Sequence, residues 1–133
     1  PELGRTLREE LLTPTRIYVQ SILRALESFE IHGMAHITGG GIPGNLSRVI
    51  PEGLSARISK KTWTPPPIFP LLKGLGRVEE AEMFRTFNMG IGFIVVVPPE
   101  QADPLVKALR ELEEQPAVIG EIDAGEGRVV LLD

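Results

Sequence analysis

The residues best suited to chemistry lie together in one stretch of the 133-residue chain, where His36 and Thr38 precede a run of three glycines. Glycines lack a Cβ atom, so successive backbone N–H groups can converge on an anion, and a helix that follows adds partial positive charge. Thr38 and Asn45 would add side-chain donors, and Arg48 would add a cation. His36 is of a type that transfers protons or orients a substrate. The stretch therefore predicts a phosphate or carboxylate site that the three glycines Gly39, Gly40 and Gly41 would face.

The residue types alone leave alternatives open for this stretch. A glycine-rich turn can also reverse the chain without any ligand, and a histidine beside it can be an ordinary structural residue. The glycine spacing matches the letters of a dinucleotide-binding fingerprint, but Pro43 is poorly placed for the required helix and no acidic residue ends the next strand. His32 and His36 are four residues apart, yet Gly33 interrupts them, so we expect no metal site.

A second polar group lies farther along the chain, where Arg85 and Asn88 alternate with apolar residues and Gly90 and Gly92 follow. Glycine at the entrance to a strand permits another backbone or a ligand to approach closely. The alternative is a plain helix-to-strand turn whose aromatic residues fill the core. We expect a functional role for Arg85 and Asn88.

Helices and strands must position these residues, and their hydrophobic spacing indicates where they lie. It predicts helices over 18–30, 45–50, 68–73, 79–86 and 100–114, and strands over 34–38, 54–58, 91–97, 117–122 and 128–132. Residues 39–44 are expected to be irregular, 91–97 to be central in its sheet, and the last two strands to form a hairpin. Asp103 and Pro104 would mark the cap and first turn of the last helix. The expected class is α+β, a layered mixed sheet with helices packed on it, with a lead-in over 1–16 and one domain over 17–133.

Composition excludes several functions. The chain has no cysteine, which rules out disulfides, thiolate metal sites and a cysteine nucleophile, and fits a cytoplasmic protein. Its net charge is −4, and it has no basic stripe of the kind that binds nucleic acid. No apolar run approaches the roughly 20 residues that cross a membrane. We therefore expect neither a nucleic-acid nor a membrane partner.

Four segments occur in an order and at distances typical of one family: Leu12–Tyr18, His36–Gly41, Glu82–Gly90 and Val118–Glu121. Together they resemble the C-terminal domain of the aminoimidazole ribonucleotide synthetases, also called phosphoribosylformylglycinamidine cyclo-ligases. The resemblance implies a part in purine synthesis, in which ATP and Mg²⁺ serve to close the imidazole ring of formylglycinamidine ribonucleotide. It also implies a cytoplasmic homodimer and a layered α+β fold.

The resemblance assigns roles by position. His36 matches a histidine with a plausible acid–base or orienting role, and Thr15 and Arg16 match a segment between two domains. The residues expected to meet substrate or phosphate are Thr38, Gly39, Gly40, Gly41, Asn45, Arg48, Asn88 and Gly90.

The family's N-terminal domain, which carries most of the nucleotide site and the main dimer contacts, has no counterpart in these residues. The chain begins with Pro1 rather than Met. We therefore expect it to be part of a longer polypeptide and inactive alone. A non-catalytic anion-binding or assembly module that reuses this fold is the alternative.

Overall fold

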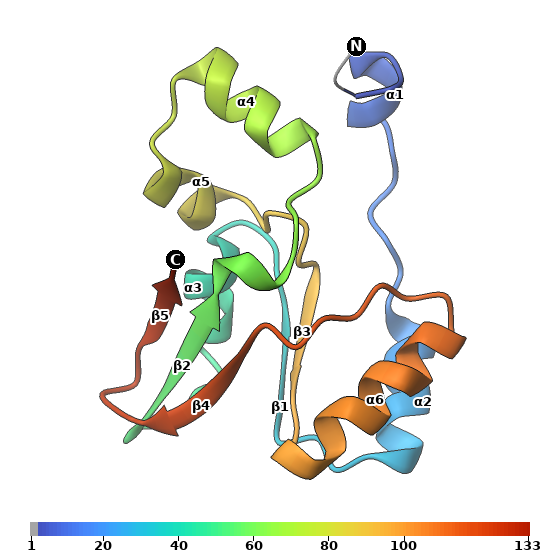
Figure 1. Cartoon of the computed structure of the whole chain (residues 1–133), viewed down its shortest axis with the longest axis vertical. Helices are drawn as coiled ribbons and strands as arrows, with labels where there is room; N and C mark the ends of the chain where they lie inside the picture. The colour runs from blue at the N-terminus through green and yellow to red at the C-terminus, as the bar shows by residue number, and fades with distance from the viewer. Residues whose placement is uncertain (1–2) are drawn as a thin grey trace.

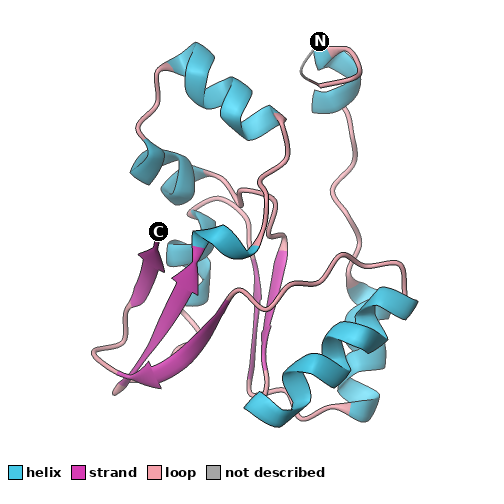
Figure 2. Cartoon of the chain, in the orientation of Figure 1, coloured by secondary structure: helices cyan, strands magenta, loops and turns pink. Residues whose placement is uncertain are grey.

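Helices and strands are interspersed along residues 3–133, the part of the chain that the computed structural model describes (Figures 1 and 2). The helices are α1 (Leu7–Leu11), α2 (Val19–Ser28), α3 (Gly41–Leu46), α4 (Ile68–Gly76), α5 (Glu80–Thr86) and α6 (Pro99–Glu111), with a 3-10 turn over Lys60–Thr62. The strands are β1 (Gly33–His36), β2 (Leu54–Ser59), β3 (Phe93–Val96), β4 (Gly120–Ala124) and β5 (Val129–Leu132). The α+β class predicted from the sequence is confirmed.

The strands form two separate sheets. Strand β1 pairs antiparallel with β3, so that His36 lies opposite Phe93. In the second sheet β2 lies in the middle, antiparallel to β4 on one side and parallel to β5 on the other. The prediction that residues 91–97 are central in a sheet is therefore wrong, because among the described residues β3 pairs with β1 alone.

The predicted C-terminal hairpin is also wrong, because β2 lies between β4 and β5. The glycine-containing turn is present, but it passes around the start of β2. The hydroxyl oxygen of Ser55 accepts hydrogen bonds from the backbone N–H groups of Glu126 and Arg128, at 3.1 and 3.3 Å. Gly125 passes so close that a Cβ there would lie 2.1 Å from this oxygen. These contacts hold the turn on β2 and separate the two strands that it joins.

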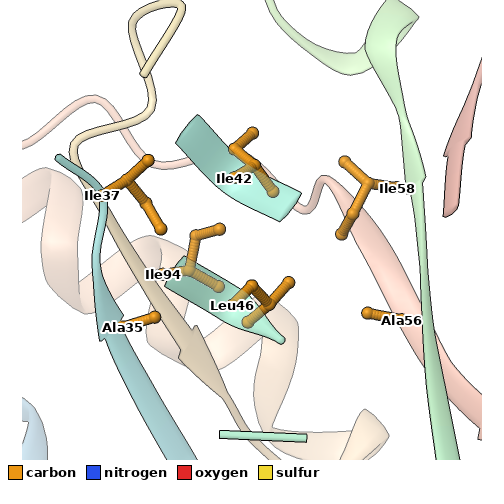
Figure 3. Packing of buried hydrophobic residues seen from close by; sticks show 7 residues of the cluster. All are labelled: Ala35, Ile37, Ile42, Leu46, Ala56, Ile58 and Ile94. Carbon is orange, nitrogen blue, oxygen red and sulfur yellow. The ribbon is translucent and has the colours of Figure 1, made fainter. Parts of the chain in front are cut away.

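Helix α3 lies between the two sheets and forms the centre of the core (Figure 3). Alternation along β1 directs Ala35 inward and leaves Met34 and His36 exposed. The buried side chains come from β1 and the residue after it, from β3, from α3 and from β2: Ala35, Ile37, Ile94, Ile42, Leu46, Ala56 and Ile58. The chain between β1 and α3 is thereby fixed at both ends by core residues.

Helix α3 begins inside the glycine run, at Gly41, rather than at the predicted residue 45. Gly40 has a φ of 99° and Gly41 a φ of 62°, which L side chains rarely adopt. Gly41 is buried against the end of α5, where a Cβ would lie 1.8 Å from the carbonyl oxygen of Phe84. The glycines therefore permit a tight turn into a buried helix, and the expectation of an irregular segment over 39–44 is wrong beyond Gly40.

Helices α4 and α5 form a second apolar cluster with the turn that follows α5. Its buried members are Met83, Phe84 and Met89. The indole N–H of Trp63 donates to the carbonyl oxygen of Met89 at 2.9 Å. Helix α4 begins after Pro67, as predicted. This cluster packs against the turn over residues 88–90 through Met89.

Helices α2 and α6 pack together at the other end of the molecule (Figure 1). Helix α6 begins at Pro99, so Pro104 lies inside it and does not mark its first turn. Ser21 and Ala25 are the buried residues of α2, whereas Val19 and Leu23 on its apolar stripe are exposed. Helix α1 buries no residue and stands apart from the sheets, connected by an irregular segment over 13–18.

Candidate functional site

The candidate site centres on the turn between β1 and α3. Gly39 and Gly40 are exposed, and no backbone carbonyl within residues 3–133 accepts a hydrogen bond from either N–H group. A Cβ at Gly39 would meet no heavy atom within 4 Å, so the space beside it is open. The turn thus offers two adjacent backbone donors to a ligand, as an anion site requires. Thr38, immediately before them, is also exposed.

Asn45 holds the turn from inside. Its side chain is buried, and its Nδ2 group donates to the carbonyl oxygens of Thr38, Gly39 and Gly41 at 3.3, 3.2 and 2.9 Å. The sequence suggested that Asn45 would offer its donors to a ligand, but the structure directs them to the protein backbone. Arg48 is exposed, and its guanidinium lies 3.5 Å from the side-chain oxygen of Asn45. Asn45 therefore shapes the turn, and Arg48 supplies the nearby positive charge.

The second polar group lies directly against this turn. Gly41 contacts the backbone at Phe84 and Phe87, the residues that lead into Asn88. The N–H of Ile37 donates to the carbonyl oxygen of Gly92 at 2.9 Å, which joins the two segments a second time. The structure therefore brings together the two stretches that the sequence singled out, although they are about fifty residues apart in the chain.

Asn88 and Gly90 shape the second turn. The side-chain oxygen of Asn88 accepts the backbone N–H of Gly90 at 2.9 Å. Gly90 has a φ of 95° and lies under Pro66, whose Cδ atom would be 2.4 Å from a Cβ. Arg85 is exposed and lies 3.7 Å from the Glu82 carboxylate on the same helix. The structure thus gives Asn88 and Gly90 a place beside the glycine turn and Arg85 a place on the surface of α5.

His36 is part of an aromatic group on the outer face of β1 and β3. Its imidazole stacks on Phe93, with 6.0 Å between ring centroids and 26° between planes. Tyr18 meets the same imidazole edge-on, with centroids 5.9 Å apart, and lies 5.4 Å from the Phe93 ring. Two aromatic rings therefore flank an exposed histidine just before the glycine turn.

The family model for the C-terminal domain of AIR synthase related proteins matches residues 1–133. The chain belongs to this family. The family resemblance seen in the sequence is thus confirmed.

Curated relatives of this AIR synthase related domain carry the name phosphoribosylformylglycinamidine cyclo-ligase. The protein from Caldanaerobacter subterraneus subsp. tengcongensis is 51% identical over 131 residues, covering 98% of this chain and 39% of the relative. The one from Pseudothermotoga lettingae is 51% identical over 130 residues, covering 98% and 38%. The one from Brevibacillus brevis is 52% identical over 128 residues, covering 96% and 37%. The chain therefore spans less than two fifths of the length of these relatives.

The fold of the AIR synthase related domain also occurs in a solved structure of a differently named protein. E. coli HypE, a hydrogenase maturation protein, superimposes with a TM-score of 0.64 at 23% sequence identity. The match covers 94% of this chain and 39% of that protein. At this identity the likeness shows a shared fold.

Two surface hollows of the AIR synthase related domain lie away from the glycine turn. One, about 510 Å³, is on the second sheet beside Arg57 and Asp123, and the other, about 460 Å³, is on α4 beside Pro67 and Leu71.

Within residues 3–133 no three His, Asp or Glu side chains gather to hold a metal ion. None of the helices in that range is long and apolar enough to cross a membrane.

The lead-in residues of the domain have distinct places. Thr15 is exposed, whereas Arg16 is attached to the residues that follow α6. Its Nη2 donates to the carbonyl oxygen of Glu113 at 2.9 Å, and its Nε lies 2.9 Å from the Glu114 carboxylate. The lead-in is thus fixed to this domain at Arg16.

Sequence reasoning missed Tyr18 as a neighbour of the site. It closes the first family segment, and its pairing with His36 depends on how the lead-in crosses the outer face of β1. The signal that could have found it is the alternation along β1, which places His36 on that outer face. Burial raises the pKa of the Tyr18 hydroxyl, an effect opposed by Arg16 and reinforced by Glu114.

Proposed function

We propose that this chain acts as the C-terminal part of an ATP-dependent cyclo-ligase that closes the imidazole ring of formylglycinamidine ribonucleotide. Relatives with the cyclo-ligase name are 51% identical across 98% of this chain, which supports the assignment. The observation that carries it is the glycine turn. Gly39 and Gly40 keep their N–H groups free of backbone carbonyls within residues 3–133, and Asn45 holds them in place.

In this reaction the chain would bind an anion and accept a proton. ATP, when bound, would supply the phosphoryl group that turns the formyl amide oxygen of the substrate into a leaving group, with release of ADP. A nitrogen of the same substrate would then attack the activated carbon, and phosphate would leave. In the proposal, Gly39 and Gly40 bind a phosphate oxygen through their N–H groups and Arg48 offsets its charge. His36 takes the proton that the attacking nitrogen loses. Asn88 and Gly90 shape the neighbouring wall.

A bound Mg²⁺ ion needs carboxylate ligands, and ATP needs a nucleotide pocket. The described residues form no carboxylate cluster that could hold a metal ion. We therefore propose that another domain of a longer polypeptide holds ATP and Mg²⁺, and that Thr15 and Arg16 lie between the two domains. The complete enzyme would be a cytoplasmic homodimer without nucleic-acid or membrane partners. The 133-residue chain would be inactive alone.

The test is to express both the complete reading frame that contains this domain and the isolated chain, and to assay each with Mg²⁺-ATP and formylglycinamidine ribonucleotide. We expect ring closure by the complete protein alone. Ring closure by the isolated chain would overturn the proposed division of labour. A complete protein that binds phosphate but never closes the ring would favour the non-catalytic anion-binding module.

A further inference from the structure

We infer that Tyr18 is a positioning residue for His36: its ring fixes the orientation of the imidazole at the entrance to the glycine turn. This inference rests on the proposed function, which places His36 in the site. Histidines that transfer protons must present a chosen ring nitrogen to the substrate, and a hydrogen bond commonly holds them in that orientation. Contacts from two aromatic rings would achieve the same without using either ring nitrogen.

The ring contacts that support this come from two directions. Phe93 lies opposite His36 in the β1–β3 register and stacks on it at 26°. Tyr18 meets the imidazole at 66°, so the two rings contact it with different orientations. Edge-to-face and offset-stacked rings at these centroid distances attract one another through their quadrupoles.

Tyr18 is itself fixed at several points. A Cβ at Gly92 would lie 1.8 Å from the Tyr18 hydroxyl oxygen and 2.8 Å from its Cζ, so the end of the ring occupies the space that glycine leaves open. The Glu114 carboxylate binds residues before and after Tyr18 in the chain: Arg16 at 2.9 Å and the hydroxyl of Ser21 at 2.6 Å. Gly92, just before β3, therefore contacts the ring directly, and Glu114, just after α6, fixes the chain on both sides of Tyr18.

The chain offers a direct spectroscopic test. NMR spectra of the isolated chain, with its fold checked by circular dichroism, would report the ring-current shifts of the His36 side-chain protons. His32, the other histidine, is exposed and lies 3.0 Å from the Glu30 carboxylate, so it serves as an internal reference. We expect Tyr18→Leu to abolish the Tyr18 contribution to the His36 shifts and Tyr18→Phe to retain it. Val19→Ala, which truncates the exposed neighbouring side chain, is the matched control and should change neither histidine.

A second variant tests the contact with Gly92 without removing the aromatic ring. Gly92 does not have a positive φ, so alanine can adopt its backbone conformation. The substitution therefore acts only through the clash of the added Cβ with Tyr18. We expect Gly92→Ala to shift the His36 signals and Gly92→Ala with Tyr18→Phe to restore them in part, because the closest atom is then gone. Unchanged His36 signals in both Tyr18→Leu and Gly92→Ala would overturn the inference.

Turnover of the complete protein separates this inference from the proposed function. A positioning role predicts that Tyr18→Leu lowers kcat by about 10- to 100-fold with little change in KM, and that Tyr18→Phe restores it. Loss of turnover in His36→Ala with normal turnover in Tyr18→Leu would overturn the role of Tyr18 alone. Normal turnover in His36→Ala would overturn the roles proposed for His36 and Tyr18 but leave the cyclo-ligase assignment intact. No turnover by the unsubstituted complete protein would instead overturn the proposed function itself.

Discussion

Gly41 lies against the carbonyl oxygen of Phe84 so closely that a Cβ would come within 1.8 Å of it. This contact joins the start of α3 to α5, and with it the glycine turn to the segment that carries Asn88. Because the obstacle is backbone rather than a flexible side chain, it cannot move aside without shifting α5. The close approach of the two halves of the candidate site at this point therefore requires glycine at position 41.

Gly41→Ala should destabilise the chain strongly. The substitution adds the Phe84 clash to the strain of a φ of 62°, which alone costs about 1–3 kcal/mol. We expect urea unfolding to show a loss of more than about 2 kcal/mol. Gly39→Ala is the matched control, because its Cβ meets open space, and should lie within about 0.5 kcal/mol of the unsubstituted chain. Equal stabilities would show that α5 yields freely at this contact.

Gly40→Val should weaken ligand binding in the complete protein. A Cβ at Gly40 would lie 3.6 Å from Nδ2 of Asn45, the group that holds the turn, so the larger valine would disturb the turn, and a φ of 99° is unfavourable for a β-branched residue. We expect a raised KM for the substrate, measured by steady-state kinetics. Thermal unfolding of the same variant separates lost binding from lost folding. Unchanged KM would mean that the turn has only a structural role.

Asn45→Asp should destabilise the fold while preserving side-chain size. An ionised carboxylate cannot donate to the carbonyl oxygens of Thr38, Gly39 and Gly41, and it would be buried among them. Leaving such groups unpaired costs about 1–3 kcal/mol, which urea unfolding at neutral pH would measure. Arg48→Ala provides the contrast, since that side chain is exposed: we expect near-normal stability and reduced turnover of the complete protein. A stable Asn45→Asp variant would contradict the role assigned to the amide.

Glu80→Gln should reduce stability at neutral pH and have no effect in acid. Hydrogen bonds from Lys60 and then Lys73 lower the pKa of Glu80 below its ordinary value of 4.5. The stabilisation is therefore present above that value and is lost as the pH falls through the folded-state pKa. Because Glu80 is half exposed, we expect less than about 1 kcal/mol by urea unfolding at pH 7, and none near pH 2. Glu52→Gln, in the exposed turn before β2, is the control.

The charged cluster formed by Glu80, Lys60, Lys73 and Asp133 should lose stability at high pH as well. Hydrogen bonds to Asp133 and to Glu80 raise the pKa of Lys60 above its ordinary value of 10.5. Stability from this lysine is therefore complete below that value and is lost as the pH rises through the folded-state pKa. A Lys60→Met variant that matched the unsubstituted chain at every pH would show that the cluster contributes nothing.

Residue type and local spacing singled out the segments of the candidate site, but they could not show the contacts between distant segments. The glycine run and Asn88 stand out in the sequence because glycine and asparagine have special backbone roles. The contact of Gly41 with Phe84 depends on where α5 lies. The contact of Tyr18 with His36 depends on the path of the lead-in across β1. Asn45 illustrates the limit: its type suggested a donor, and only the fold decides that the protein backbone receives the hydrogen bonds.

The strand errors have a similar cause. The glycines over residues 125–127 indicate a turn, and a turn between two apolar segments is typical of a hairpin. Local signals do not show that a third strand lies between the two segments. Residues 91–97 are apolar enough for a central strand, yet β3 pairs with β1 alone among the described strands because α3 separates the two sheets.

The position of β2 between β4 and β5 has a consequence for protein synthesis. Residues 54–59 emerge from the ribosome before either partner of this strand, because the paired residues lie some sixty to seventy-five residues later in the chain. The three-stranded sheet therefore cannot close until the ribosome has released residue 132, and pairing over such separations is slow. Until then Ala56 and Ile58, buried in the finished core, stay accessible. We expect nascent chains to leave this strand open to aggregation or chaperone binding until β5 has emerged.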